Sequence, residues 1–268
     1  MSGRFSPKAR RKPRRETALE RFSAGRIGAG SVMRAGAASE RFLPDSIVCD
    51  SSALISLADS CFLSLLGELR QMMRGDFIIS ETVKYEIIDH PLRTKSHTLP
   101  AIRLKLAVND RVLRVVGVPG LEKETDDILW LANNLLFMNG KPLAMLQRGE
   151  AETLALAREL GLKNVLIDER TTRTLVEDAE DMRRHLSQEL HTKVELNHEY
   201  HERFLRLTER MNFFRSSELL VVAYERGLFR RFGQMERQAI EAALYGLKFA
   251  GCSISFEEID EYVRSLRR

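Results

Sequence analysis

Acidic side chains recur at positions where a folded chain can bring them together. Asp50 follows the apolar run Ile47–Cys49 and precedes serines and apolar residues at helical spacing. This order predicts a strand, an acid at its carboxyl end and a Ser-capped helix. Asp168 and Glu169 follow a second apolar run, Asn164–Ile167. Because open α/β sheets keep their sites at the carboxyl ends of strands, we expect Asp50 and Asp168 to lie close together.

Further acids lie on two predicted helices. Glu86 lies beside the apolar stripe of a short helix, so it can point along the sheet, although a solvated helix flank is the simpler interpretation of this residue alone. Glu150 and Glu152 lie in the first turn of a helix that runs from Gly149 to Gly161. Negative charge is favoured there by the helix dipole whatever the function, so these two acids are informative only together with the others.

Carboxylates gathered at one edge repel one another unless a cation neutralises them. A ligand set of oxygen atoms suits Mg²⁺ or Mn²⁺ better than zinc. Such a cation can activate water and stabilise the leaving oxygen in the hydrolysis of a phosphodiester. His198 and His201 have a spacing that can also hold a metal, but without cysteines around them a solvated helix face is the better interpretation.

The net charge of +4 hides an asymmetry. Residues 1–41 contain eleven Lys or Arg against three Glu, about +8, so the rest of the chain is about −4. We expect residues 1–43 to be a disordered basic arm that favours polyanions such as RNA. A solubilising tail is the alternative, as is a start at Met33. The predicted nucleic-acid contacts of this arm are Lys8, Arg10, Arg11, Lys12, Arg14 and Arg15.

Apolar runs alternate with helical patterns along the chain. Strands are predicted at 47–49, 76–80, 111–118 and 164–167, with helices between them, including one over Leu121–Asn139. This alternation predicts a three-layer α/β/α sandwich with a parallel sheet, formed by one domain over residues 44–268.

The highly charged segment at about 174–213 has no Gly or Pro and is predicted to be a helical insertion. Lys193–Leu196 is its one candidate strand. We expect one or two long helices with an apolar stripe that is free to contact a second copy of the chain or another protein.

Composition excludes some classes of protein. Hydrophobic residues make up 44% and charged residues 30%, no apolar run approaches the roughly 18 residues of a membrane helix, and no secretory signal is visible. The three cysteines form no CxxC pair, which favours a reducing compartment. We therefore expect a cytoplasmic protein that does not contact a membrane.

Several segments together resemble the PIN-domain ribonucleases, specifically the branch of uncharacterised prokaryotic PIN-like proteins related to toxin ribonucleases. The resemblance spans roughly residues 45–255 in the order of the family. Its elements are CDSSALISLA at Cys49–Ala58, VKYEI at Val83–Ile87, RGEAETLALARELG at Arg148–Gly161, NVLIDERTTR at Asn164–Arg173, SSELLVVAYERGLF at Ser216–Phe229 and GLKFAGCSIS at Gly246–Ser255.

The resemblance implies a role for each acid. Asp50 is the first metal ligand and Glu86 the second acid, Glu152 is the third with Glu150 as its possible substitute, and Asp168 is the fourth unless Glu169 takes that role. The hydroxyls of Ser51 and of Ser216 or Ser217 occupy positions near the metal or its water.

The implied activity is that of an endoribonuclease that hydrolyses RNA with Mg²⁺ or Mn²⁺. A PIN-like module that binds RNA or protein with weak or no catalysis is the alternative. The long segment 174–213 departs from the short connection that is usual in the family, so a second alternative is an assembly subunit that binds its partner, or a second copy, through this segment.

Overall fold

A five-stranded parallel sheet forms the centre of the molecule. The structure, a computed structural model, describes residues 42–266. Its main sheet has the strand order β3-β2-β1-β6-β8, and every neighbouring pair is parallel. The strands are β1 (Ile47–Cys49), β2 (Phe77–Ile79), β3 (Leu113–Val115), β6 (Asn164–Leu166) and β8 (Asn212–Phe214). The basic residues from Lys8 to Arg15, and the predicted arm up to residue 41, lie outside the described residues.

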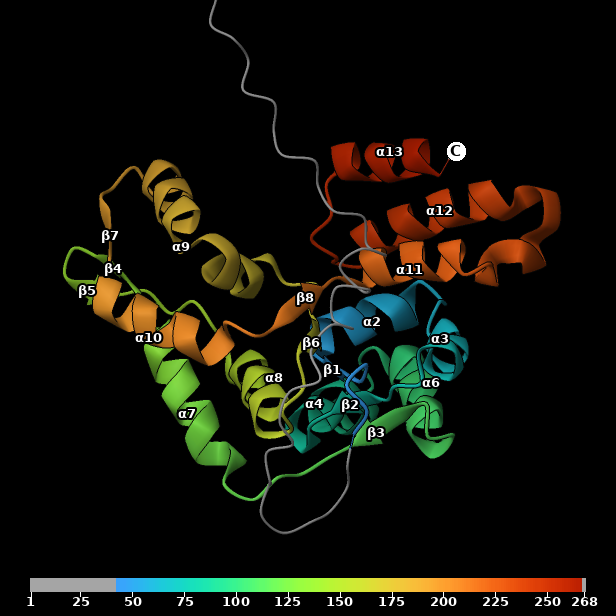
Figure 1. The fold of residues 1–268 in the computed structure, drawn as a ribbon, viewed down its shortest axis with the longest axis horizontal. Coiled ribbons are helices and arrows are strands. Elements are labelled where there is room, and N and C mark those ends of the chain that lie inside the picture. Colours follow the sequence, from blue (N-terminus) through green and yellow to red (C-terminus); the bar gives the residue numbers. More distant parts are fainter. Residues whose placement is uncertain (1–41, 267–268) are drawn as a thin grey trace, which may run out of the picture.

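Helices cover both faces of this sheet (Figure 1). Side chains alternate along a strand, so Ile47 and Cys49 enter one apolar cluster whereas Val48 enters the other. The first cluster contains residues of α2 (Ser51–Asp59), α3 (Leu65–Met73), α6 (Thr98–Asn109), α11 (Ser216–Glu225), α12 (Glu236–Phe249) and α13 (Phe256–Ser265). The second contains residues of α7 (Leu121–Ala132), α8 (Arg148–Glu159), α9 (Arg170–Glu189) and α10 (His198–Thr208). The predicted α/β/α sandwich is confirmed.

Short helical turns complete the main body. Between β2 and α6 the chain forms α4 (Glu81–Lys84), the π-helical turn η1 (Tyr85–Asp89) and α5 (His90–Thr94), and a 3₁₀ segment η2 (Leu228–Met235) joins α11 to α12. No helix among residues 42–266 is long and apolar enough to cross a membrane.

A second, antiparallel sheet forms beside α7 and α10, on the left in Figure 1, and has the order β5-β4-β7. It consists of β4 (Leu136–Met138), β5 (Lys141–Pro142) and β7 (Val194–Leu196). The predicted helix over Leu121–Asn139 is therefore too long, because α7 ends at Ala132. Asn139 and Gly140 both have positive φ, the geometry of the tight hairpin turn that an Asn-Gly pair favours.

The charged segment 174–213 contains the predicted helices but also two strands. The candidate strand Lys193–Leu196 forms β7. The last residues of the segment begin β8, the edge strand beside β6 in the main sheet, which was not predicted. Met182, Val194 and Phe204 are buried in the second apolar cluster. Of the other apolar side chains in this segment, Leu186 and Leu207 are partly buried against the same cluster whereas Leu190 is 42% exposed, so a partner contact through this segment stays a prediction.

Candidate metal and nuclease site

The predicted acids collect at the carboxyl end of the main sheet. Asp50 directly follows β1, and Asp168 and Glu169 follow β6, its parallel neighbour. The π-helical turn η1 brings Glu86, and the start of α8 brings Glu150 and Glu152.

Asp50 and Asp168 are joined by Ser52. Asp50 is 1% exposed, and its Oδ2 accepts hydrogen bonds from the Ser52 backbone N–H at 3.0 Å and from the Ser52 hydroxyl at 2.6 Å. The backbone N–H of Asp168 in turn donates to the Ser52 hydroxyl oxygen at 3.2 Å. Asp50 thereby caps α2 while its other oxygen, Oδ1, is buried without a hydrogen-bond partner.

Asp168 is held from the other side by the start of α11. Its carboxylate is fully buried and accepts from the Ser216 backbone N–H at 2.7 Å and from the Ser216 hydroxyl at 2.6 Å. A carboxylate has about four lone-pair sites, so these two bonds leave Asp168 further acceptor capacity. The neighbouring Ser217 hydroxyl is buried without a hydrogen-bond partner.

Glu86 projects from a helix whose register is shifted by the π turn, a feature that occurs frequently at functional sites. Its carboxylate lies over the backbone of Gly149 in the first turn of α8. A Cβ atom at Gly149 would approach Glu86 Oε1 to 2.9 Å and Oε2 to 3.1 Å. The missing side chain at Gly149 therefore makes room for this acid.

The two acids of the α8 start face different neighbours. Glu150 Oε2 accepts from the Gln147 backbone N–H at 2.7 Å, and its charge interacts with those of Asp50 and Glu169. Glu152 Oε2 accepts from the Thr82 hydroxyl at 2.7 Å, and its charge acts on Glu86. Glu150 is thus the acid of α8 that interacts with Asp50.

Burial and mutual repulsion raise the pKa of three of these acids. Burial is the largest cause in each case, and the charge of Asp168 raises the pKa of Asp50 further. The charges of Asp50 and Glu152 do the same for Glu86, while hydrogen bonding from Ser51 acts in the opposite direction. The pKa of Glu150 rises to about 7 because its own burial is reinforced by Asp50 and Glu169. A cation at this edge would relieve the repulsion.

The donor chemistry fits a hard divalent cation, because every candidate ligand is an oxygen and one oxygen of Asp50 is buried without a partner. The acids do not form a complete coordination site, however. Within residues 42–266 no three His, Cys, Asp or Glu side chains form a group that could hold a metal ion.

Two side chains that hold these acids by hydrogen bonds were not predicted. Ser52, and not Ser51, connects Asp50 to Asp168, and Thr82 orients Glu152. The Asp-Ser-Ser sequence contains a signal for Ser52, since an N-cap Asp accepts from the backbone two residues later. Glu169 caps α9 by accepting from the Thr172 N–H at 2.8 Å.

A family model described as a PIN domain matches residues 46–180, half of the chain. The chain belongs to the PIN-domain family. None of the curated proteins matches it significantly. PIN domains are commonly nucleases and usually use Mg²⁺ or Mn²⁺. The matched part of this PIN domain contains all six predicted acids, whereas Ser216 and Ser217 lie beyond it.

Proposed function

We propose that this PIN-domain protein is a metal-dependent endoribonuclease that hydrolyses RNA phosphodiester bonds at the carboxyl edge of its main sheet. The observation that carries the proposal is the convergence of Asp50, Glu86 and Glu150, whose pKa values are all raised by burial and by neighbouring carboxylates. Such clusters of perturbed acids occur preferentially at functional sites.

In this proposal Asp50 and Asp168 hold a Mg²⁺ or Mn²⁺ ion, and Glu86 completes the site directly or through water. We assign the third acid to Glu150 rather than to Glu152, because Glu150 interacts with Asp50 whereas Glu152 is turned toward Thr82. Glu152 and Glu169 then act from the periphery. Ser52 and Ser216 keep the two buried aspartates in place through the hydrogen bonds that they donate.

A bound divalent ion supplies a Lewis acid that activates water and stabilises charge on the leaving oxygen. The chain itself contributes position and proton transfer. The pKa of Glu150 is raised to about 7 without a cation, and a cation bound beside it would lower that pKa, so the carboxylate would be ionised at neutral pH and able to accept a proton from water.

The test is incubation of the purified full chain with single-stranded and structured RNA in the presence of Mg²⁺, Mn²⁺ or EDTA. We expect cleavage with either metal, none with EDTA, and a loss of at least about a hundredfold in the Asp50→Asn variant. Cleavage that persists in EDTA, or that Asp50→Asn leaves intact, would refute the metal-dependent mechanism.

A second candidate is a PIN module that binds RNA or a protein with weak or no catalysis. The absence of a finished metal group within residues 42–266 favours it. The same assay separates the two, since a binding module retains RNA on a filter with and without metal but produces no fragments.

A further inference from the structure

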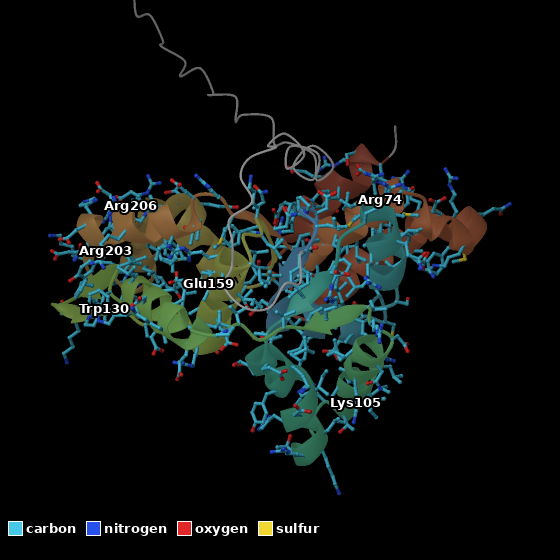
Figure 2. All side chains as sticks on the ribbon, turned by 60° about the horizontal axis from the view of Figure 1, so that its bottom comes forward. Arg74, Lys105, Trp130, Glu159, Arg203 and Arg206 are labelled. Carbon is cyan, nitrogen blue, oxygen red and sulfur yellow. The ribbon has the colours of Figure 1, made fainter. Side chains whose placement is uncertain are left out.

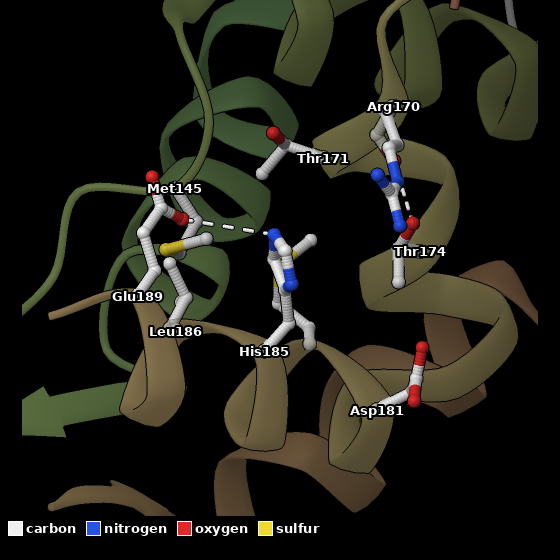
Figure 3. Close-up of a pocket in the computed structure, with 9 residues that line it drawn as sticks. Met145, Arg170, Thr171, Thr174, Asp181, His185, Leu186 and Glu189 are labelled. Carbon is white, nitrogen blue, oxygen red and sulfur yellow. Dashed lines mark hydrogen bonds and ion pairs between the residues drawn. The ribbon is translucent and has the colours of Figure 1, made fainter. Parts of the chain in front are cut away.

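Helix α9 is kinked beside the carboxyl end of the main sheet, where Asp50, Asp168 and the neighbouring Glu side chains lie. We call this end of the sheet the acidic edge. Asp178 has φ −160° and ψ 75° inside the helix, and its carboxylate accepts from the Asp181 backbone N–H at 2.9 Å, which starts the second half of α9. The two halves and the segment before α8 enclose a cavity of about 170 Å³ (Figure 3). We call this cavity the α9 elbow.

The lining of the α9 elbow combines apolar, planar, cationic and anionic groups. Its two carboxylates are those of Asp181, which is paired with Arg184 at 3.2 Å, and Glu189. Met145, Met182 and Leu186 supply apolar surface, and the His185 ring points into the space between the two halves of the helix (Figure 3). His185 Nε2 lies 3.6 Å from Glu189 Oε2.

Arg170 brings a positive charge to the same cavity. Its side chain is exposed, and among residues 42–266 no hydrogen bond or ion pair engages its guanidinium group. The Thr174 hydroxyl donates to the Arg170 backbone carbonyl at 2.9 Å, so the backbone at the rim is fixed while the guanidinium is available. A guanidinium group binds a phosphate through two parallel hydrogen bonds.

Both walls of the α9 elbow continue into the acidic edge. Arg170 directly follows Glu169, whose charge reaches Glu150. On the other wall, Met145 lies two residues before Gln147, whose backbone N–H donates to Glu150. A chain of nucleotides with one phosphate at the acids therefore has a neighbouring nucleotide within reach of this cavity.

We propose that the α9 elbow is a nucleotide subsite for single-stranded RNA, in which a base stacks on His185 over the methionine and leucine surface while Arg170 binds the adjoining phosphate. The subsite rests on the proposed ribonuclease function. Unpaired bases are recognised by stacking on His and Arg planes together with contacts to their edges. A free inorganic anion would use Arg170 but leave the apolar surface of Met145, Met182 and Leu186 exposed.

Binding can be tested without any cleavage. The full chain is titrated with adenosine 5′-monophosphate, and separately with inorganic phosphate, while its backbone amide resonances are followed by NMR. We expect the nucleotide to shift the amides of Thr171, Thr174 and His185 saturably and phosphate alone to leave His185 unmoved. Arg170→Gln should weaken nucleotide binding roughly tenfold. The matched control Arg206→Gln removes an exposed arginine on α10 (Figure 2) that does not line the cavity, and this variant should bind like the parent.

Cleavage kinetics give a second measurement. Thr174→Trp fills the cavity from its rim and should raise KM for single-stranded RNA roughly tenfold with little change in kcat. Gln188→Trp, exposed on the same helix but outside the cavity, is the control.

The two proposals fail in different ways. Nucleotide binding at the α9 elbow without RNA cleavage would refute the ribonuclease function and keep the site. Absent or phosphate-like shifts at the elbow, or wild-type KM in both Arg170→Gln and Thr174→Trp, would overturn the subsite and leave the ribonuclease intact.

Discussion

At the scale of single residues, Gly149 determines where the Glu86 carboxylate can lie. No other described glycine has a carboxylate so close to the place of its missing Cβ atom. The contact involves the far end of a flexible Glu side chain, so a methyl group at Gly149 displaces the acid at little expense to the fold.

Gly149→Ala should therefore separate stability from metal binding. We expect a free energy of unfolding that is unchanged or higher by up to about 1 kcal/mol, because Ala is the better helix former. Mn²⁺ affinity should fall roughly tenfold as Glu86 moves. Gly67→Ala is the control, since its Cβ would meet only Val112 at an ordinary 3.5 Å. Calorimetry that finds equal Mn²⁺ affinity in the two variants would exclude Glu86 from the site.

Glu150 links the acidic edge to the pH dependence of stability. Its pKa is about 7 in the folded chain against a usual value of 4.5. Between these values the folded state binds more protons than the unfolded state, so metal-free stability falls as pH rises from about 4.5 to about 7.

Glu150→Gln removes this component, and Gln can still complete the capping box with Gln147. In metal-free denaturant unfolding, the free energy of unfolding of the variant minus that of the parent should be larger at pH 8 than at pH 5 by about 1 kcal/mol or more. The control is Glu159→Gln, at an exposed residue near the other end of α8 (Figure 2). Its free energy of unfolding should differ from that of the parent by the same amount at both pH values. If the stabilities of Glu150→Gln and the parent differ by the same amount at both pH values, the pKa of Glu150 is not raised in the metal-free protein.

At the scale of elements, the C-terminal helix α13 helps to hold the start of α11. Arg215 is 3% exposed, and its guanidinium donates to the Ser253 carbonyl at 3.0 Å and to Glu258 Oε1 and Oε2 at 3.2 Å each. The Ser253 backbone N–H donates to the Asp168 carbonyl at 3.2 Å. Arg215 and Asp168 are therefore both hydrogen-bonded to the same C-terminal segment.

Glu258→Gln tests the interaction between α13 and Arg215. Gln keeps the capping box with Ser255 but removes the charge opposite the buried Arg215 guanidinium, so we expect a loss of about 1–3 kcal/mol in the free energy of unfolding. The adjacent and exposed Glu257→Gln should change it by less than about 0.5 kcal/mol. Equal stability of the two variants would mean that Glu218 alone suffices for Arg215.

Sequence reasoning predicted the strands that lie within clear apolar runs and missed those that lie beside a helical pattern. The strand β8 was missed because it directly follows a charged helical segment and has only two apolar residues, Phe213 and Phe214. The second sheet was hidden by the apolar end of α7, although Asn139-Gly140 carried a usable hairpin signal.

The site was predictable to the level of the acidic positions but not of their directions. Glu150 and Glu152 are two residues apart, about 200° around a helix, so they cannot face the same neighbour. Pattern alone does not say which of them faces Asp50. That answer depends on how α8 packs on the sheet, and the π turn that directs Glu86 has no sequence signature of its own.

At the scale of the whole molecule, charge is divided between the N-terminal segment and the rest. Residues 1–41 carry about +8 and the remaining residues about −4. The acidic edge therefore repels RNA backbone in the absence of metal, and we propose that the basic segment compensates for this repulsion.

Deleting residues 1–41 should weaken RNA binding and lower its dependence on salt, because fewer counterions are released. Preference among RNA sequences should not change, since phosphate contacts carry no sequence information. Filter binding at several salt concentrations measures the slope for the intact and shortened chains. An unchanged slope would mean that this segment does not contact the phosphate backbone.

The most direct test of the account is calorimetric titration of the full chain and of Asp50→Asn with Mn²⁺. Asn retains the cap of α2 but lowers the charge of the group whose Oδ1 is buried without a partner. We predict a saturable Mn²⁺ site in the parent, an affinity at least about tenfold lower in the variant, and a melting temperature without metal that is equal or higher in the variant. Equal Mn²⁺ binding by the two proteins would contradict the assignment of this acidic edge as the metal site.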